Sequence, residues 1–171
     1  MSINNEYLVI SGTNRKGSNS MKIARLYQSY LQELGIEAEV TGLEDIDLTH
    51  RNDHFIRFEQ EKLLPAKKYI IIAPEYNGSI PGILKLMFDL ADYRKVWKGK
   101  KALLVGISTG RSGNVRGLEH LTTILHYLMV VVHPSKLPIS SIDKLMNGNQ
   151  EMLDKGTLGA IREQIRDFVE F

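Results

Sequence analysis

Residues 69–85 read YIIIAPEYNGSIPGILK, and this stretch indicates the fold class. Residues 69–73 form a continuous apolar run, which is typical of a strand covered on both faces. Residues 74–82 contain two prolines and two glycines and predict a loop of fixed shape, and Pro81 suits the first turn of a helix. After it the apolar residues recur at helical spacing, namely Ile83, Leu84, Met87, Phe88 and Ala91. The stretch therefore predicts a buried strand, a loop and a helix in succession.

The same alternation continues in both directions along the chain. Further apolar runs predict strands over residues 7–10, 38–43, 102–107 and 129–132. Further helical patterns cover residues 21–34, 55–64, 115–128 and 158–169. The strand at 38–43 carries Glu39, so it is expected nearer an edge of the sheet. Strands that alternate with helices predict an α/β fold, a parallel sheet with helices on both faces.

Length and composition predict one globular domain over residues 1–171. The chain has a mass of 19.4 kDa, 43% hydrophobic residues and 25% charged residues, which are ordinary globular values. It contains no cysteine, which excludes disulfides, thiolate nucleophiles and cysteine-ligated metals.

Charge and hydropathy bear on partners and location. The net charge of +2 gives no support for a nucleic-acid partner. No apolar run approaches the ~20 residues that span a bilayer, so no membrane association is expected. Residues 1–6 lack the basic and apolar regions of a signal peptide, so a cytoplasmic protein is expected.

Ligands of such sheets bind beyond the carboxyl ends of the strands, where the strand order switches. This rule singles out the loops after the first, third and fourth strands. The first, residues 11–20, contains two glycines, four hydroxyl residues and Arg15, and it leads into a helix. Unpaired amides and the helix dipole favour an anion there, and Arg15 can bind phosphate oxygens. A flexible turn with a good N-cap is an equal alternative. The loop is neither a Walker A motif nor a G-x-G-x-x-G motif.

The other two loops could hold a flat ring. In residues 74–82, Tyr76 offers a planar surface and Asn77 offers hydrogen bonds, although a rigid turn with a surface tyrosine is the simpler interpretation. Residues 108–114 could present backbone amides to the other side of a ring, or could merely cap the next helix.

Together the loops resemble those of the NADPH-dependent FMN reductase family, which includes quinone, azo-dye and chromate reductases. The family's phosphate loop, Gly-Ser-x-Arg-x-x-Ser, is matched by residues 12–18 with Thr13 in place of serine. Its flavin loop, Pro-Glu-Tyr-Asn-x-Ser-x-Pro-Gly-x-Leu-Lys, is matched by residues 74–85 at every fixed position. The chain departs from the family at Leu86, where an asparagine is common, and at Arg111 in a loop that is commonly richer in glycine.

The resemblance implies a flavodoxin-like three-layer sandwich with a five-stranded parallel sheet in the order 2-1-3-4-5. It implies bound FMN, reduced by NADPH or NADH, and electrons passed on to a quinone, azo compound or similar small acceptor. It also implies a homodimer or homotetramer. No side chain is assigned a catalytic role, because the cofactor carries the chemistry. The residues implied to bind FMN are Thr13, Arg15, Ser18, Asn19, Ser20, Pro74, Glu75, Tyr76, Asn77, Gly78, Ser79, Ser108, Thr109 and Gly110.

Two other functions are compatible with this fold, and two local features of the sequence each allow a functional and a purely structural interpretation. The fold could serve a flavodoxin-type electron carrier, although such carriers tend to be strongly acidic, or an FMN-binding regulatory domain. His50 and His54 have a helical metal-ligand spacing, but no third ligand supports a metal site. The basic run at residues 94–101 could attract an anionic partner, but it is better explained as a solvated turn, with Trp97 at the sheet edge.

Overall fold

The structure is a computed structural model that describes residues 6–146 and 154–171. The signal-peptide expectation for residues 1–6 therefore lies almost wholly outside the described residues. No helix within the described ranges has both the length and the apolar character needed to cross a membrane.

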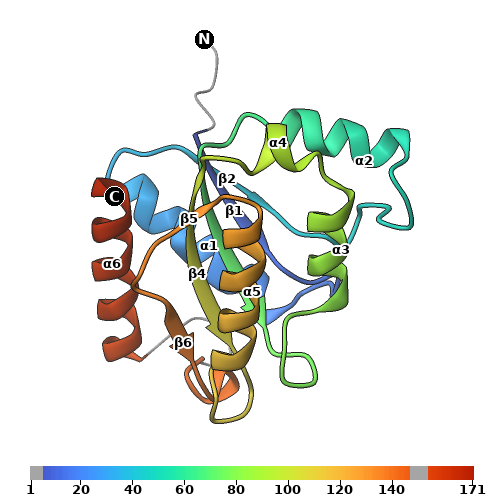
Figure 1. Cartoon of the computed structure of the whole chain (residues 1–171). Coiled ribbons are helices and arrows are strands. Elements are labelled where there is room, and N and C mark those ends of the chain that lie inside the picture. Colours follow the sequence, from blue (N-terminus) through green and yellow to red (C-terminus); the bar gives the residue numbers. More distant parts are fainter. Residues whose placement is uncertain (1–5, 147–153) are drawn as a thin grey trace.

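The core of the molecule is a parallel sheet (Figure 1). The central strands are paired in the order β2-β1-β3-β4-β5, which confirms the predicted α/β class and strand order. A further strand, β6, pairs with β4. The strands are β1 (Tyr7–Ser11), β2 (Ala38–Thr41), β3 (Lys68–Pro74), β4 (Lys101–Ile107), β5 (Val131–Val132) and β6 (Leu137–Ile139).

The fifth position of the sheet differs from the prediction, because two short strands share it. The predicted strand over 129–132 is reduced to β5, since Met129 has a φ of 61° and belongs to the turn after the preceding helix. Pro134 then interrupts the pairing because proline has no N–H to donate. The chain returns beside β4 at β6, where Val105 is opposite Leu137. This second strand brings the following residues to the carboxyl end of the sheet.

Helices cover both faces of the sheet. The helices α1 (Asn19–Glu33) and α6 (Lys155–Glu170) pack on one face. The opposite face is covered by α2 (Asp53–Phe58), α3 (Gly82–Leu90) and α5 (Val115–Tyr127). Three short elements complete the chain, namely the π-helix η1 (Glu59–Leu63), α4 (Tyr93–Val96) and the 3-10 helix η2 (Ile142–Lys144).

Strand β3 shows how the alternation of side chains builds the two layers. Ile70 and Ile72 join the core under α1 and α6, whereas Tyr69, Ile71 and Ala73 join the core under α3 and α5. All five are fully buried, as the continuous apolar run predicts. The edge position expected for the strand with Glu39 is confirmed, since β2 is the terminal strand of the sheet.

The basic run at residues 94–101 is more ordered than the predicted turn. Part of it forms α4, and Trp97 is fully buried under the sheet rather than at its edge. The Trp97 ring centroid lies 5.0 Å from those of Tyr69 and Phe88, which fixes α4 against β3 and α3. Lys100 donates hydrogen bonds to the carbonyls of Leu63 and Leu64 and to the Tyr69 hydroxyl. The run therefore closes the end of the sheet opposite the loops after the strands.

Lys100→Met is expected to change how protein stability depends on pH. Burial lowers the pKa of Lys100 from 10.5 to about 8. The charged form is disfavoured in the fold, so the wild type should gain stability relative to the variant as pH rises from about 8 to about 10.5. The gain should be on the order of 1 kcal/mol after allowing for the exposed part of the side chain. Urea denaturation at pH 7.5 and pH 10 measures it, with Lys98→Met as the charge-matched control. A stability difference that stays constant with pH contradicts the assignment.

Candidate functional site

A groove of about 430 Å³ lies at the carboxyl ends of the strands. Backbone hydrogen bonds join the loops around it: Glu75 N donates to Ile107 O at 2.9 Å, and Ser108 N donates to Ile139 O at 3.0 Å. The volume is within the range of about 300–1,000 Å³ typical of ligand pockets. Its walls are formed by Thr13, Arg15, Lys16, Gly17, Ser18, Asn19, Ser20, Pro74, Glu75, Tyr76, Ile107, Ser108, Thr109, Ile142 and Asp143.

One end of the groove is the N-terminus of α1. Ser18 is the N-cap, and its hydroxyl accepts a hydrogen bond from Met21 N at 3.2 Å. The backbone N–H groups of Gly17, Asn19 and Ser20 donate to no other group among the described residues. The first turn of α1 contains no acidic residue of its own. Free amides and an uncompensated helix dipole make this end a favourable place for an anion.

Tyr76 connects the first loop to the third. Its hydroxyl forms a 2.8 Å hydrogen bond with the hydroxyl of Thr13, which is almost fully buried. The Arg15 guanidinium carbon lies 5.0 Å from the centroid of the Tyr76 ring, close enough for a cation–π contact. Arg15 itself remains exposed on the groove side. The two loops therefore place a cation and an aromatic ring together at the anion-attracting end.

The rest of the third loop turns away from the groove. Asn77 and Gly78 have φ values of 52° and 76° and form the tip of a tight turn closed by the bridge between Tyr76 and Ser79. Ser79 forms a 2.8 Å hydrogen bond with Nδ1 of His120 on α5. Asn77, Gly78 and Ser79 are not among the residues that line the groove, and the contact of all three with the ring stays a prediction. They shape and anchor the loop that presents Tyr76.

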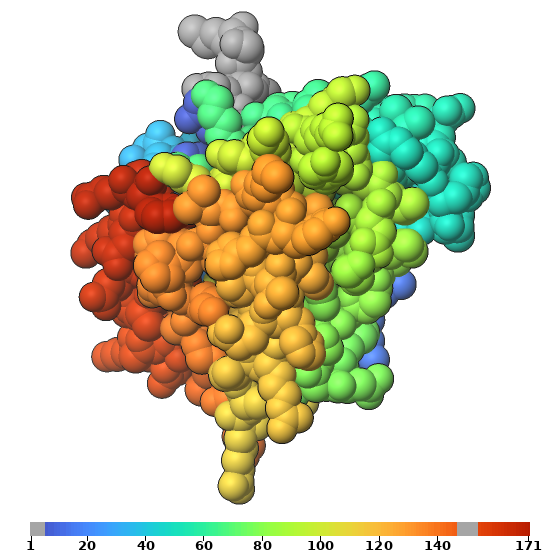
Figure 2. All heavy atoms as spheres, in the orientation of Figure 1, coloured from blue at the N-terminus to red at the C-terminus, as the bar shows by residue number. Residues whose placement is uncertain are grey.

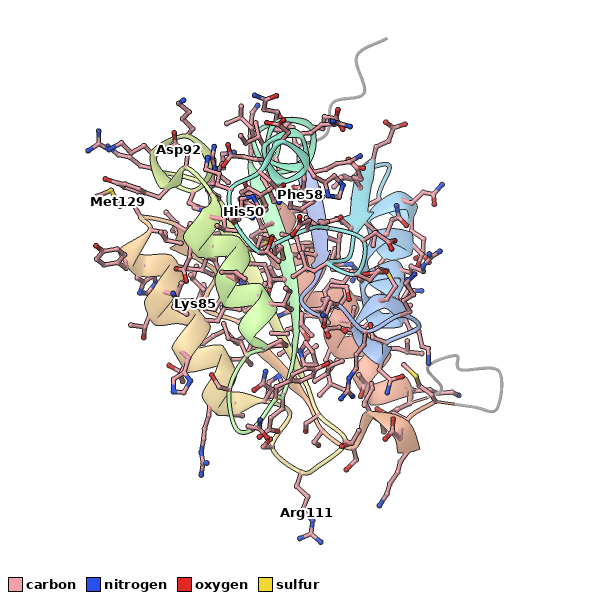
Figure 3. All side chains as sticks on the ribbon, turned by 90° about the vertical axis from the view of Figure 1, so that its right-hand side faces the viewer. His50, Phe58, Lys85, Asp92, Arg111 and Met129 are labelled. Atoms are coloured by element: carbon pink, nitrogen blue, oxygen red, sulfur yellow. The ribbon has the colours of Figure 1, made fainter. Side chains whose placement is uncertain are left out.

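The fourth loop contributes Ser108 and Thr109 to the groove, whereas Gly110 lies outside it. The Ser108 hydroxyl donates to Gly110 O and accepts from Gly113 N, so it folds its own loop. The Thr109 N–H donates to no other described residue. Arg111 extends from the tip of this loop into solvent, and the loop projects from the end of the molecule (Figures 2 and 3).

Several groove residues were not predicted. Lys16 and Gly17 belong to the first loop, and Ile107 ends β4. Ile142 and Asp143 come from η2 after β6 and form the wall opposite α1. The missed signal is the short apolar run 137–139 followed by two serines, which is the pattern of a strand ending at the same edge.

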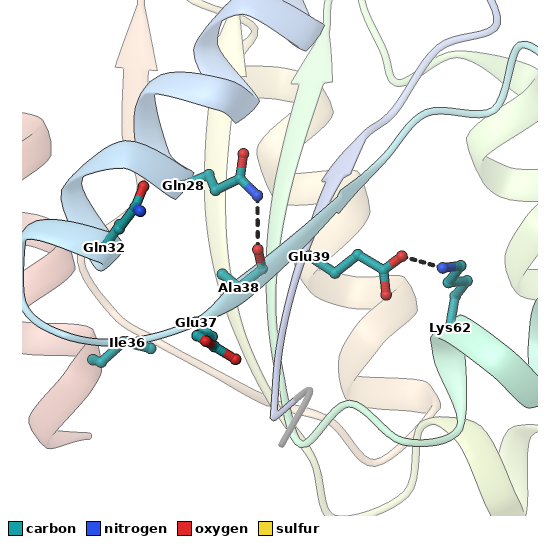
Figure 4. Close-up of a pocket in the computed structure, with 7 residues that line it drawn as sticks. All are labelled: Gln28, Gln32, Ile36, Glu37, Ala38, Glu39 and Lys62. Carbon is teal, nitrogen blue, oxygen red and sulfur yellow. Dashed lines mark hydrogen bonds and ion pairs between the residues drawn. The ribbon is translucent and has the colours of Figure 1, made fainter. Parts of the chain in front are cut away.

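Another hollow, of about 470 Å³, lies beside the edge strand β2 (Figure 4). The side-chain amide of Gln28 is already paired there, because its Nε2 donates a hydrogen bond to Ala38 O at 2.8 Å. Glu39 forms an ion pair with Lys62 across the hollow. None of the loops that follow the carboxyl ends of the described strands contributes to its lining. The smaller groove is therefore the better candidate for a ligand site.

The two histidines with metal-ligand spacing bond to neighbouring groups. His54 Nδ1 accepts from Asp47 N at 3.2 Å, and His50 Nδ1 shares a 3.0 Å hydrogen bond with Thr49. Within residues 6–146 and 154–171 no group of three or more His, Asp or Glu side chains could hold a metal ion.

The groove geometry agrees with comparisons to known proteins. A sequence model of the NADPH-dependent FMN reductase family matches residues 6–144. The chain belongs to this family. Among individual relatives, an NAD(P)H-dependent FMN reductase of Pseudomonas aeruginosa is 30% identical over 97% of this chain and 94% of its own length. A quinone reductase of Escherichia coli is 34% identical over 65% of this chain and 61% of its own. Membership in the FMN reductase family confirms the predicted class, an oxidoreductase that uses FMN and a nicotinamide cofactor.

Solved structures show the same fold as this FMN reductase family member. An apo NADH:FMN oxidoreductase has a TM-score of 0.78 at 19% identity and covers 95% of this chain and 87% of that one. A flavodoxin 2 from Bacillus cereus has a TM-score of 0.68 at 16% identity, with coverages of 96% and 98%. These likenesses confirm the predicted flavodoxin-like fold.

Proposed function

We propose that the groove binds FMN and that the protein catalyses NAD(P)H-dependent reduction of a quinone, azo compound or similar small acceptor. The main observation behind this proposal is that three loops distant in sequence form one groove. In it the anion-attracting N-terminus of α1 lies beside the Tyr76 ring. Family membership and the quinone reductase among the relatives support the same activity.

The residues present fit the phosphate of FMN. The free N–H groups of Gly17, Asn19 and Ser20 favour an anion, because N–H groups without a partner gain hydrogen bonds from a charged acceptor. Arg15 adds a guanidinium that can form two parallel hydrogen bonds to phosphate oxygens. Thr13 and Ser18 complete this end, with their hydroxyls holding Tyr76 and the start of α1 in place.

The ring system would lie towards the third and fourth loops. Pro74, Glu75 and Tyr76 form one wall of this part, and Ser108 and Thr109 form the other. Glu75 is held by a hydrogen bond from Ser112, so it braces the two loops against each other. Asn77, Gly78, Ser79 and Gly110 act by shaping these loops rather than by lining the groove.

Bound FMN would supply the redox chemistry by accepting a hydride from the nicotinamide and passing electrons to the acceptor. The protein's role is to bind the flavin, to orient it and to polarise its ring. Thr109 lines the groove and its N–H has no partner among the described residues, so this N–H would stabilise negative charge on the ring as a preorganised dipole. We assign no side chain as a proton donor or acceptor.

Tyr76→Ala is expected to change the visible absorbance of bound FMN and to weaken binding about five-fold. The change removes an aromatic contact worth about 1 kcal/mol and the partner of Thr13. Tyr76→Phe is the matched control, since it keeps the ring and loses only the hydroxyl. A flavin spectrum identical to the wild type in the alanine variant removes Tyr76 from the site.

Steady-state oxidation of NADPH and NADH, each with and without a quinone, tests the proposed activity. Quinone-dependent turnover by the FMN-loaded protein is the expected result. Retained FMN without nicotinamide oxidation would instead favour a carrier or a regulatory domain. A ratio of kcat/KM for the two nicotinamides gives the cofactor preference.

A homodimer or homotetramer and a cytoplasmic location are parts of this proposal. Apolar side chains at the end of α5 and in β5 are exposed, with Tyr127 86% exposed, Met129 53% and Val131 49%. Burial of such a patch would favour self-association. Light scattering after gel filtration should give a multiple of 19.4 kDa for the wild type. Tyr127→Ser with Met129→Ser should shift the mass towards the monomer.

A further inference from the structure

The anion-attracting end of the groove already contains a carboxylate. Asp143 lies in η2, and Asn19 Nδ2 at the start of α1 donates to its Oδ1 at 2.7 Å. The two residues are 124 positions apart in sequence, so the contact depends on the fold alone. Asp143 lines the groove together with the first loop.

This position is electrostatically unusual for a phosphate site. The dipole of α1 and its free N–H groups attract a negative charge, and α1 has no acid in its first turn. Asp143 supplies that charge from the opposite wall. Both polar atoms of the Asn19 amide are engaged, because its Oδ1 accepts from Lys22 Nζ at 3.1 Å while its Nδ2 is bonded to Asp143.

A phosphate ester bound at this end would therefore find Asn19, one of the groups that could donate a hydrogen bond to it, already bonded to the Asp143 carboxylate. Phosphate monoesters carry about −1.5 to −2 charges at pH 7, so the two anions repel. The other charged groups at this end are Arg15, which faces the Tyr76 ring, Lys16, which lies 3.5 Å from Asp45, and Lys22, which is bonded to Asn19. Glu75, at the ring end, is bonded to Ser112. The Asn19 N–H that is bonded to Asp143 becomes available to the phosphate only when that bond breaks.

We propose that Asp143 competes with the FMN phosphate for Asn19 and the start of α1, and so lowers the affinity of the groove for FMN. This inference rests on the proposed function, because it concerns the same groove. It assigns Asp143 to affinity for the phosphate and not to the redox step.

Asp143→Asn tests the competition, because the amide has the same size and can still accept from Asn19. FMN should bind this variant about ten-fold more tightly, measured by quenching of flavin fluorescence, and should dissociate more slowly. Riboflavin, which lacks the phosphate, should bind both proteins equally. Asp167→Asn on the exposed side of α6 is the control with the same change in net charge.

Other outcomes overturn the inference. Unchanged FMN affinity, or equal tightening for FMN and riboflavin, means that Asp143 does not compete with the phosphate. Weaker FMN binding in both Asp143→Asn and Asp143→Ala means that Asp143 tethers the wall instead. If the wild type binds FMN normally, these results leave the proposed function intact. A wild type that binds neither flavin removes the proposed function, and this inference with it.

Discussion

Arg15→Ala is expected to raise the dissociation constant of FMN about 100-fold. Arg15 is the one residue of the first loop that brings a guanidinium to the groove, 5.0 Å above the Tyr76 ring. A hydrogen bond to a charged group contributes about 1.5–3 kcal/mol, and two parallel bonds reach the upper part of that range. Fluorescence titration with FMN measures the change.

Riboflavin serves as the internal control for Arg15→Ala, because a phosphate-binding residue should leave its affinity unchanged. Arg15→Lys should fall between the wild type and alanine, since it keeps the charge and loses the planar fork. At saturating FMN, the rate of flavin reduction should change little, because Arg15 positions the phosphate and does not meet the reacting atoms. Equal FMN affinity in the wild type and Arg15→Ala would falsify the assignment of the phosphate end.

Gly106→Ala is expected to destabilise the protein by about 3 kcal/mol or more. A Cβ at this position would lie 2.2 Å from Gly113 O and 3.0 Å from the side chain of Leu118. Strand β4 and the fourth loop would have to separate, which moves Ser108 and Thr109 out of the groove wall. The variant should therefore also bind FMN poorly at temperatures where it is still folded.

Gly110→Ala is the matched control for Gly106→Ala, because it makes the same change in the loop that follows β4 and no atom is within 4 Å of the added Cβ. Urea denaturation of the two variants beside the wild type measures the difference in the free energy of unfolding. Similar stabilities for both variants would mean that the close approach of the loop to β4 does not limit the fold.

Most of the fold could be predicted, because its signals are local. The apolar run 69–73 and the helical pattern of α1 each specify one element, and alternation along the chain then specifies the topology. Strand β6 was missed because it has only three residues, one of them Pro138.

The site was predicted less completely, since its walls depend on packing between distant segments. The matched motifs identified the first and third loops, whose residues do line the groove. A motif does not show that Asn77 and Gly78 form a tight left-handed turn, because that follows from backbone φ values. Nor could it find Asp143, whose place opposite Asn19 arises from β6 returning beside β4. Burial of Trp97 was missed for a similar reason, as its partners come from β3 and α3.

Anaerobic titration of the FMN-loaded protein with NADPH, followed by flavin absorbance, tests the central claim most directly. The account predicts that the protein binds FMN, that NADPH rapidly bleaches the flavin absorbance, and that a quinone restores it. Bound flavin that remains oxidised in excess NADPH and NADH would contradict the reductase function.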